Sequence, residues 1–245
     1  MLKRDTVSYT TAYTRRVPSP SGRSLTVTVD PQQELAALLL LPAAAHACLV
    51  FAHGAGAPMA HPSMERQALA LCAAGVATLR FQFPYMQRAA RRPDPPAVCH
   101  AAVRAAVAEA SRQLPAMPLF AGGRSFGGRM TSQAQAAAPL AGVRGLIFFA
   151  FPLHPAGKPG IERAAHLDRV HLPMLFLQGT RDGLAELVLL QPVVARLGPR
   201  ATLELIEEAD HSFHVPRATG RTDQQVTTVL ATRCSTWMRQ VCAAG

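Results

Sequence analysis

Phe120-Ala121-Gly122-Gly123-Arg124-Ser125-Phe126-Gly127-Gly128 is the stretch of this chain that decides its fold. The apolar run 118–121 indicates the end of a buried strand, and an alanine-rich helical segment begins near Gly128. Between them, the G-x-S-x-G pattern centred on Ser125 is typical of a nucleophile elbow, a strained turn that holds a serine hydroxyl above a sheet. Strand and helix pass too closely there for side chains, and both flanking positions, Gly123 and Gly127, are glycine.

Strand and helix patterns alternate on both sides of this turn. Continuous apolar runs are typical of strands covered on both faces, whereas apolar residues three and four apart indicate helices. The alternation after residue 46 predicts an α/β fold, with a mostly parallel central sheet and helices on both faces. The predicted strands are 24–29, 34–41, 47–52, 76–83, 118–122, 143–151, 174–178 and 202–206, and the predicted helices are 61–74, 97–114, 127–138, 161–169, 184–197 and 222–241.

Length and composition predict one globular domain. The chain has 245 residues, of which 49% are hydrophobic and 16% charged, so an intrinsically disordered chain is excluded. We expect a loosely ordered N-terminus over 1–22 and a single domain over 23–245, and the prolines and short length of the apolar run 36–52 argue against a membrane span. Segment 1–16 has no apolar core of the kind that a secretory signal needs.

The charge balance is strongly basic, at +10, yet it does not predict nucleic-acid binding. The basic residues are 23 arginines and two lysines, they are scattered, and the densest group, Arg88, Arg91 and Arg92, has no interleaved aromatic residues. The five cysteines are odd in number and include no C-x-x-C pair, so we expect neither disulfides nor a metal site, and a reduced, cytoplasmic location.

Three residue types in a particular order suggest nucleophilic catalysis. Ser125, Asp182 and His211 each follow a predicted strand, and the carboxyl ends of parallel strands meet at one edge of a sheet. The order Ser, Asp, His is that of the α/β-hydrolase triad. We expect His211 to take the proton of Ser125 and Asp182 to hold the imidazole in the right tautomer.

Two neighbours leave alternatives for these roles. Asp210 could replace Asp182 as the acid and His214 could replace His211 as the base, although adjacent side chains diverge and His211 lies closer to a strand end. The oxyanion hole is predicted from the backbone N–H groups of Phe126 and Ala55. No dinucleotide fingerprint or phosphate loop is present, so no cofactor is expected.

By these motifs the chain resembles the α/β-hydrolase family over roughly residues 25–242. Segments 123–127, 178–182 and 210–211 carry the broad resemblance. HGAGAPM (53–59), RFQFPYM (80–86) and FPLHPAGKP (151–159) resemble a small lidless branch close to dienelactone-hydrolase-like proteins. That branch includes the hydrolase-like domain of a subunit of an animal histone-acetyltransferase complex. The resemblance implies an eight-stranded type of sheet and a Ser-Asp-His triad, but dienelactone hydrolases proper use cysteine where this chain has Ser125.

The sequence thus predicts a serine hydrolase acting on small-molecule esters. The alternatives are a catalytically idle hydrolase-fold interaction module and an acyltransferase with the same triad, and the oligomeric state is left open. Only about twenty residues separate the predicted strands 143–151 and 174–178, too few for a separate lid. We therefore expect a shallow site for short acyl chains. One wall is expected to contain Pro84, Tyr85 and Met86, and the other Leu153 and His154. The residues expected to bind substrate are Gly54, Tyr85, Met86, Leu153 and His154.

Overall fold

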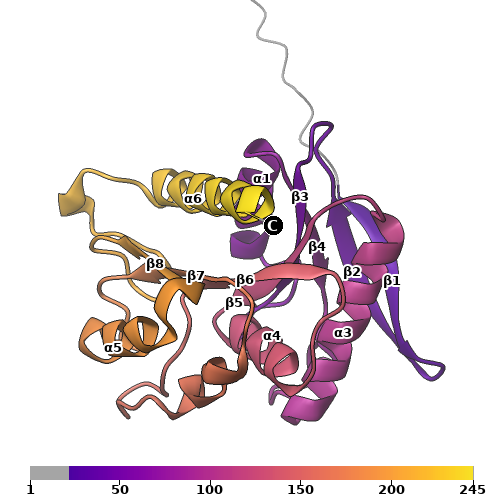
Figure 1. The fold of residues 1–245 in the computed structure, drawn as a ribbon, viewed down its shortest axis with the longest axis horizontal. Coiled ribbons are helices and arrows are strands. Elements are labelled where there is room, and N and C mark those ends of the chain that lie inside the picture. The colour runs from indigo at the N-terminus through magenta and orange to yellow at the C-terminus, as the bar shows by residue number, and fades with distance from the viewer. Residues whose placement is uncertain (1–21, 245) are drawn as a thin grey trace, which may run out of the picture.

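The computed structural model describes residues 22–244, which form one sheet flanked by helices (Figure 1). The prediction of a loosely ordered 1–22 lies outside these residues, apart from Gly22. The sheet has eight strands in the order β1-β2-β4-β3-β5-β6-β7-β8. Only the β1–β2 and β2–β4 pairs are antiparallel. The strands are β1 (Arg23–Asp30), β2 (Gln33–Leu40), β3 (Ala47–Ala52), β4 (Val76–Phe81), β5 (Leu119–Arg124), β6 (Val143–Phe149), β7 (Met174–Gly179) and β8 (Ala201–Ile206).

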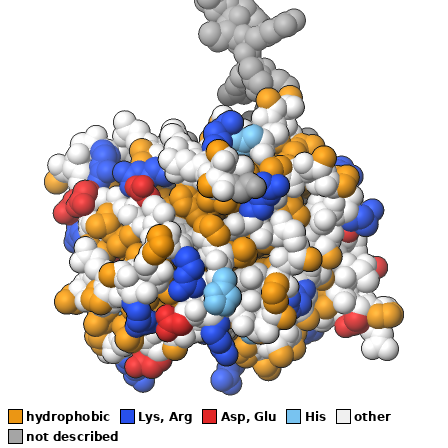
Figure 2. Space-filling view, viewed as in Figure 1, with side chains coloured by type: hydrophobic (Ala, Val, Ile, Leu, Met, Phe, Trp, Pro, Cys, Tyr) orange, Lys and Arg blue, Asp and Glu red, His pale blue; other side chains and the backbone are white. Residues whose placement is uncertain are grey.

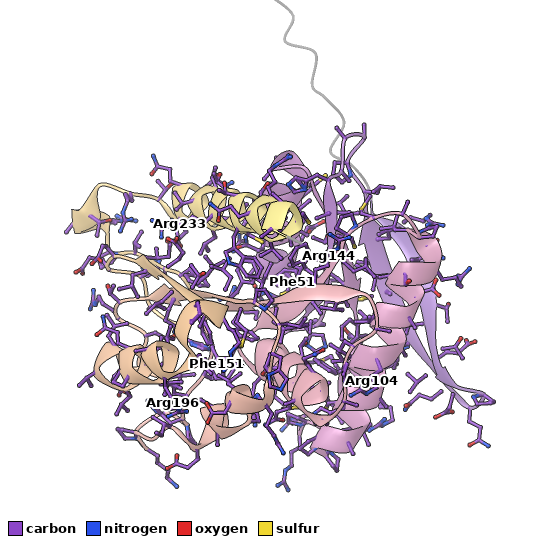
Figure 3. All side chains as sticks on the ribbon, in the orientation of Figure 1. Phe51, Arg104, Arg144, Phe151, Arg196 and Arg233 are labelled. Carbon is purple, nitrogen blue, oxygen red and sulfur yellow. The ribbon has the colours of Figure 1, made fainter. Side chains whose placement is uncertain are left out.

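The helices cover both faces of the sheet, which confirms the predicted architecture. Helices α1 and α6 lie on one face, and α3, α4 and α5 on the other (Figure 1). Figure 3 shows Phe51 on the α6 side and Phe151 near α4, and each is fully buried in the core of its own side. The helices are α1 (Pro62–Ala73), α2 (Pro84–Gln87), α3 (Pro96–Gln113), α4 (Phe126–Ala137), α5 (Leu187–Leu197) and α6 (Asp223–Ala244), with short 3₁₀ helices η1 (Glu162–Arg169), η2 (Gly198–Arg200) and η3 (Arg217–Thr219).

Strand continuity explains why the sequence pattern was informative. Strands β3, β4 and β7 are buried at every position, because helices cover both of their faces. The edge strand β1 alternates between exposed and more buried positions instead. The apolar run 36–52 forms parts of β2 and β3, as expected for two strands joined by a turn.

The largest departures from the predicted elements lie in the loops that border the strand ends. Helix α2 begins at Pro84 inside a segment expected to be a loop, since proline is well suited to the first turn of a helix. Helix α5 starts at Leu187, three residues later than predicted. The backbone N–H of Leu184 donates to the Asp182 carboxylate, so the chain there forms a turn rather than helix.

The connection from β6 to β7 carries only η1, and no cap domain covers the carboxyl edge of the sheet among the described residues. All five cysteines are free thiols, and burial raises the pKa of Cys48 and of Cys99 to about 12. No helix in the part of the chain that the structure describes is long and apolar enough to cross a membrane. Arginine and lysine side chains are dispersed over the face seen in Figure 2, among apolar and acidic ones.

Candidate active site

Ser125 occupies the turn between β5 and α4 in a strained backbone conformation. Its φ of 49° and ψ of −115° lie in a region that residues with a side chain rarely adopt. Its backbone N–H donates to the carbonyl oxygen of Phe149 on β6 at 2.9 Å, which ties the turn to the neighbouring strand. Ser125 is therefore presented at the carboxyl edge of the sheet, as the elbow pattern predicts.

The glycines around Ser125 are required by close backbone packing. A Cβ at Gly123 would lie 2.5 Å from the Ala52 carbonyl oxygen, and one at Gly127 would lie 2.6 Å from the same atom. Gly122 is tighter still, because its Cβ would meet the Ile147 backbone. Strand β5 and helix α4 can pass β3 and β6 at this distance only without side chains, which is why the motif needs glycine.

Ser125, His211 and Asp182 form a continuous chain of hydrogen bonds. His211 Nε2 lies 2.8 Å from Ser125 Oγ, and His211 Nδ1 lies 2.8 Å from Asp182 Oδ2. The carboxylate can only accept, so the ring proton sits on Nδ1 and Nε2 is free to accept the serine proton. The structure thus brings together the three predicted catalytic residues, although 86 and 29 positions separate the bonded pairs.

The Asp182 carboxylate is held by more than the histidine. It is 3% exposed, and its Oδ1 accepts the backbone N–H of Leu184 at 2.8 Å. Its Oδ2 also accepts a hydrogen bond from Gln178 Nε2, while Gln178 Oε1 accepts the N–H of Phe151. Sequence reasoning missed Gln178, although a glutamine at the end of a fully apolar strand was a signal for it. These bonds satisfy the buried carboxylate and fix its position relative to His211.

Neither alternative for the acid and base has the required geometry. Asp210 Oδ1 accepts the backbone N–H groups of Ser212 and His214, so this carboxylate closes the turn that carries His211. His214 is exposed and pairs with Asp223, and this hydrogen bond raises the pKa of its imidazole. His211 is the histidine that contacts Ser125, and Asp182 is the carboxylate that contacts His211.

Two backbone N–H groups next to Ser125 have no hydrogen-bond partner among the described residues. They belong to Phe126, the first residue of α4, and to Ala55 in the turn after β3. The hydroxyl of Tyr85 donates to the Ala55 carbonyl oxygen at 2.9 Å and so orients this turn. These are the two N–H groups predicted for an oxyanion hole, and they lie at the edge of the same cavity as Ser125.

His53 holds the other end of the same turn. Its Nε2 accepts the N–H of Phe83, so the ring proton is on Nδ1 and donates to the Gly54 carbonyl oxygen at 2.7 Å. Burial lowers the pKa of His53 to about 4, which keeps the ring neutral near pH 7. His53 therefore orients the glycine turn that carries Ala55.

A cavity of about 510 Å³ opens beside the serine. Ser125, Phe126 and Ala55 form its reactive wall. The remaining lining residues are mostly apolar or proline, with three charged side chains among them: Pro93, Asp94, Pro96, Arg129, Met130, Pro152, Pro155, Ala156, Arg163 and Leu184. This volume suits a small organic molecule. A molecule bound in the cavity could contact both Ser125 and the backbone N–H groups of Ala55 and Phe126.

A family model described as "Alpha/beta hydrolase domain" matches residues 45–239. The chain belongs to the α/β-hydrolase family.

Solved structures similar to this α/β hydrolase share its fold at low sequence identity. They include a dienelactone hydrolase from Anabaena variabilis (21% identity, TM-score 0.71, covering 91% of this chain and 98% of that one). A serine hydrolase without lid from Xanthomonas campestris has 23% identity and a TM-score of 0.69, with 89% and 95% covered. An esterase domain from a Rhodothermus marinus protein has 16% identity and a TM-score of 0.67, with 89% and 98% covered. At these identities the likeness shows the fold alone.

In this α/β hydrolase, the residues expected to bind substrate do not line the cavity beside Ser125. Gly54, Tyr85, Met86, Leu153 and His154 are all absent from its walls. Tyr85 and Leu153 are fully buried, and Met86 is partly buried against the core. The side chains of Tyr85, Leu153 and His154 are buried in the protein interior, and four prolines are among the residues that line the cavity instead.

His154 illustrates this correction most clearly. It is expected to bind substrate at the wall of the site, yet it is 1% exposed and its Nε2 bonds the Glu186 carboxylate. The N–H groups of Leu153 and His154 both donate to the Leu184 carbonyl oxygen. The loop after β6 is thereby fastened to the loop that follows Asp182, a link between distant segments that sequence spacing does not reveal.

A second cavity of this α/β hydrolase, about 620 Å³, lies at the amino ends of β6, β7 and β8. Arg144, which Figure 3 labels near α6, lines it together with Pro173 and Trp237. The described residues that line this cavity include no histidine, cysteine, aspartate or glutamate. Among the described residues, no group of three or more His, Cys, Asp or Glu is placed to hold a metal ion.

Proposed function

We propose that this α/β hydrolase is a serine hydrolase that cleaves short-chain carboxylic esters through an acyl-enzyme on Ser125. The observation that carries the proposal is the unbroken chain of hydrogen bonds from Ser125 Oγ through His211 to Asp182. At the Ser125 end of this chain of hydrogen bonds lie the backbone N–H groups of Ala55 and Phe126, which have no partner among the described residues. An idle hydrolase-fold module has no need of this arrangement.

The geometry supports a two-step acyl transfer. Ser125 Oγ attacks the ester carbonyl carbon while its proton passes to His211 Nε2, and the two free N–H groups stabilise the negative oxygen. The C–O bond to the alcohol then breaks, and the imidazolium returns its proton to the leaving alkoxide. A water molecule repeats the sequence on the acyl-enzyme, with His211 again as base, and releases the acid and free Ser125. Asp182 stabilises the imidazolium in both steps.

The similar structures named above add support of a general kind. They include proteins described as a dienelactone hydrolase, a serine hydrolase without lid and an esterase domain. The narrower sequence resemblance, to the branch with the histone-acetyltransferase subunit domain, is a proposal about descent and carries no partner with it. We further propose a cytoplasmic location, which the five free thiols favour, and a small-molecule substrate rather than nucleic acid or membrane.

The test is covalent labelling with a fluorophosphonate probe together with hydrolysis of p-nitrophenyl acetate and butyrate. Wild-type protein should be labelled and should turn over both esters, whereas Ser125→Ala should lose both properties while its circular dichroism and melting temperature stay close to wild type. Ser212→Ala is the matched control, because this exposed hydroxyl lies beside His211 and forms no side-chain hydrogen bond among the described residues. Undiminished hydrolysis by pure Ser125→Ala protein would contradict the proposal.

The same assay separates the two alternatives. An idle module leaves wild-type protein unlabelled and without turnover. An acyltransferase is labelled but passes the acyl group to an added alcohol or thiol faster than to water, which product analysis detects.

A further inference from the structure

Two arginines line the cavity beside Ser125, and the reaction proposed above uses neither of them. Arg129 lies one turn into α4, and its backbone N–H donates to the Ser125 carbonyl oxygen at 3.1 Å. Arg163 lies on η1, which packs against α4. Both side chains are half-buried. Two positive charges from separate elements therefore border the cavity that contains the nucleophile.

Neither guanidinium has a carboxylate partner in the part of the chain that the structure describes. No hydrogen bond or ion pair joins either side chain to another described residue, and Arg129 Nε is buried without any acceptor. Burial lowers the pKa of the Arg129 guanidinium, and the positive charge of Arg163 lowers it further. The Arg129 guanidinium lies over the Phe126 ring, whose centroid is 5.7 Å from Arg129 Cζ. Partial burial of a cation without a counter-ion costs free energy, because the charge loses part of its hydration. A bound anion beside the two guanidinium groups would reduce this cost.

The position of Arg129 in α4 adds a second cost. The first turn of a helix favours negative charge because its N–H groups carry partial positive charge. Helix α4 has no acidic residue in that turn, and Arg129 follows directly after it. The helix terminus and the arginine both attract an anion at this place, and neither stabilises the other.

Other charged and titratable groups around the cavity do not neutralise the pair. Asp94 lines the cavity, but its Oδ1 pairs with Arg88 at 2.6 Å. His100 and His166 lie near Arg129, and burial is the main cause that lowers the pKa of each, so both are neutral near pH 7. Among the described residues, Asp94 is the only acidic side chain that lines the cavity, and its Oδ2 has no hydrogen-bond partner. The cavity thus carries two arginines against one carboxylate already paired elsewhere.

We propose that the preferred substrate of this hydrolase is an ester that bears a free carboxylate, bound by Arg129 and Arg163 while Ser125 attacks the ester carbonyl. This inference rests on the proposed esterase function and names the substrate class of the same site. A guanidinium presents a planar fork of N–H donors that matches the two oxygens of a carboxylate. A neutral ester leaves both arginines without a counter-ion and therefore forgoes this interaction.

The experiment compares substrates with the same carbon skeleton, with and without the charge. The acyl-side pair is 4-nitrophenyl hydrogen adipate against 4-nitrophenyl hexanoate, and the alcohol-side pair is 4-acetoxybenzoate against 4-acetoxybenzamide. The measured quantity is the ratio of kcat/KM for the anionic ester to that for its neutral partner. In wild-type protein we expect this ratio to exceed about ten for one of the two pairs, and that pair reveals which side of the ester faces the arginines.

Variants then locate the effect. Arg129→Gln and Arg163→Gln should each lower the ratio by about tenfold, mainly through a higher KM for the anionic ester, while Arg129→Lys should keep more of it than Arg129→Gln. Arg196→Gln is the control and should leave the ratio unchanged. Arg196 lies on α5 (Figure 3) and forms a surface ion pair with Asp168, away from the cavity. Ratios retained in both glutamine variants would overturn the inference.

The outcomes distinguish this inference from the proposed function. If wild-type protein hydrolyses the neutral esters at least as well as both anionic ones, the carboxylate preference is wrong and the esterase stands. If no ester in either pair is turned over and no fluorophosphonate label is found, the proposed function fails, and the substrate inference fails with it.

Discussion

His211 Nδ1 lies 2.8 Å from the carboxylate of Asp182, whereas Asp210, its neighbour in sequence, bonds the backbone of its own turn. Twenty-nine positions separate the bonded pair, and one separates the pair that does not bond. The two carboxylates therefore have different tasks. Asp182 orients the imidazole, and Asp210 shapes the loop that presents it.

Asp182→Asn should lower kcat by on the order of 10³ to 10⁴, because an amide can donate to Nδ1 and so favours the tautomer that cannot accept the serine proton. Asp210→Asn should cost far less, since it keeps an acceptor oxygen for the turn. Steady-state hydrolysis of p-nitrophenyl butyrate by the two variants decides between them. A larger loss in Asp210→Asn would reverse the assignment of the acid.

Tyr85→Phe tests whether orientation of the Ala55 turn matters for catalysis. The hydroxyl of Tyr85 donates to the Ala55 carbonyl oxygen, and its loss removes about 1 kcal/mol of net hydrogen bonding. Because the adjacent N–H is proposed to stabilise the transition state, we expect kcat to fall roughly fivefold with little change in KM. A rise in KM at constant kcat would instead place Tyr85 against the substrate, contrary to its burial.

Acid should destabilise the fold through two buried histidines. Burial lowers the pKa of His53 and of His166 to about 4, from the ordinary value of 6.5. Between pH 6.5 and 4 the unfolded chain therefore binds more protons than the folded one, so the free energy of unfolding falls as pH falls, by about 1.4 kcal/mol per pH unit for each group. Above pH 6.5 this contribution is fully present.

Urea unfolding at several pH values between 7 and 4.5 measures this slope. His166→Leu removes one of the two groups, and its partner Ser132 retains a hydrogen bond to the Arg129 carbonyl oxygen. The variant should lose stability less steeply on acidification than wild type. Parallel curves for the two proteins would show that His166 binds protons equally in the folded and unfolded states.

Chain-length preference follows from the size of the cavity and the absence of a cap among the described residues. The cavity beside Ser125 measures about 510 Å³, and the β6–β7 connection carries only η1. Each methylene left outside forgoes about 0.8 kcal/mol of binding. Among neutral p-nitrophenyl esters from C2 to C16 we expect the highest kcat/KM at roughly C2 to C6. A maximum at C12 or longer would reveal a deep acyl tunnel.

Local pattern was enough to predict the elbow and the sheet. Apolar continuity at 47–52 and 174–177 identified buried strands, because a parallel strand covered on both faces has no polar side. Gly123 and Gly127 were informative for a similar reason, since a close backbone approach excludes every residue with a side chain. The positions of Ser125, Asp182 and His211 followed from the rule that parallel strands end at one edge.

The sequence by itself therefore determined the fold class, the elbow and the residue types of the site. Only the tertiary structure decided which side chains form the cavity: it buried Tyr85, Leu153 and His154, and it placed Arg129 and Arg163 on the cavity wall. The physical reason is that backbone conformation and strand burial depend on near neighbours, which sequence patterns record. The direction of a loop side chain depends on contacts such as that of His154 with Glu186, which only the packing of distant segments creates.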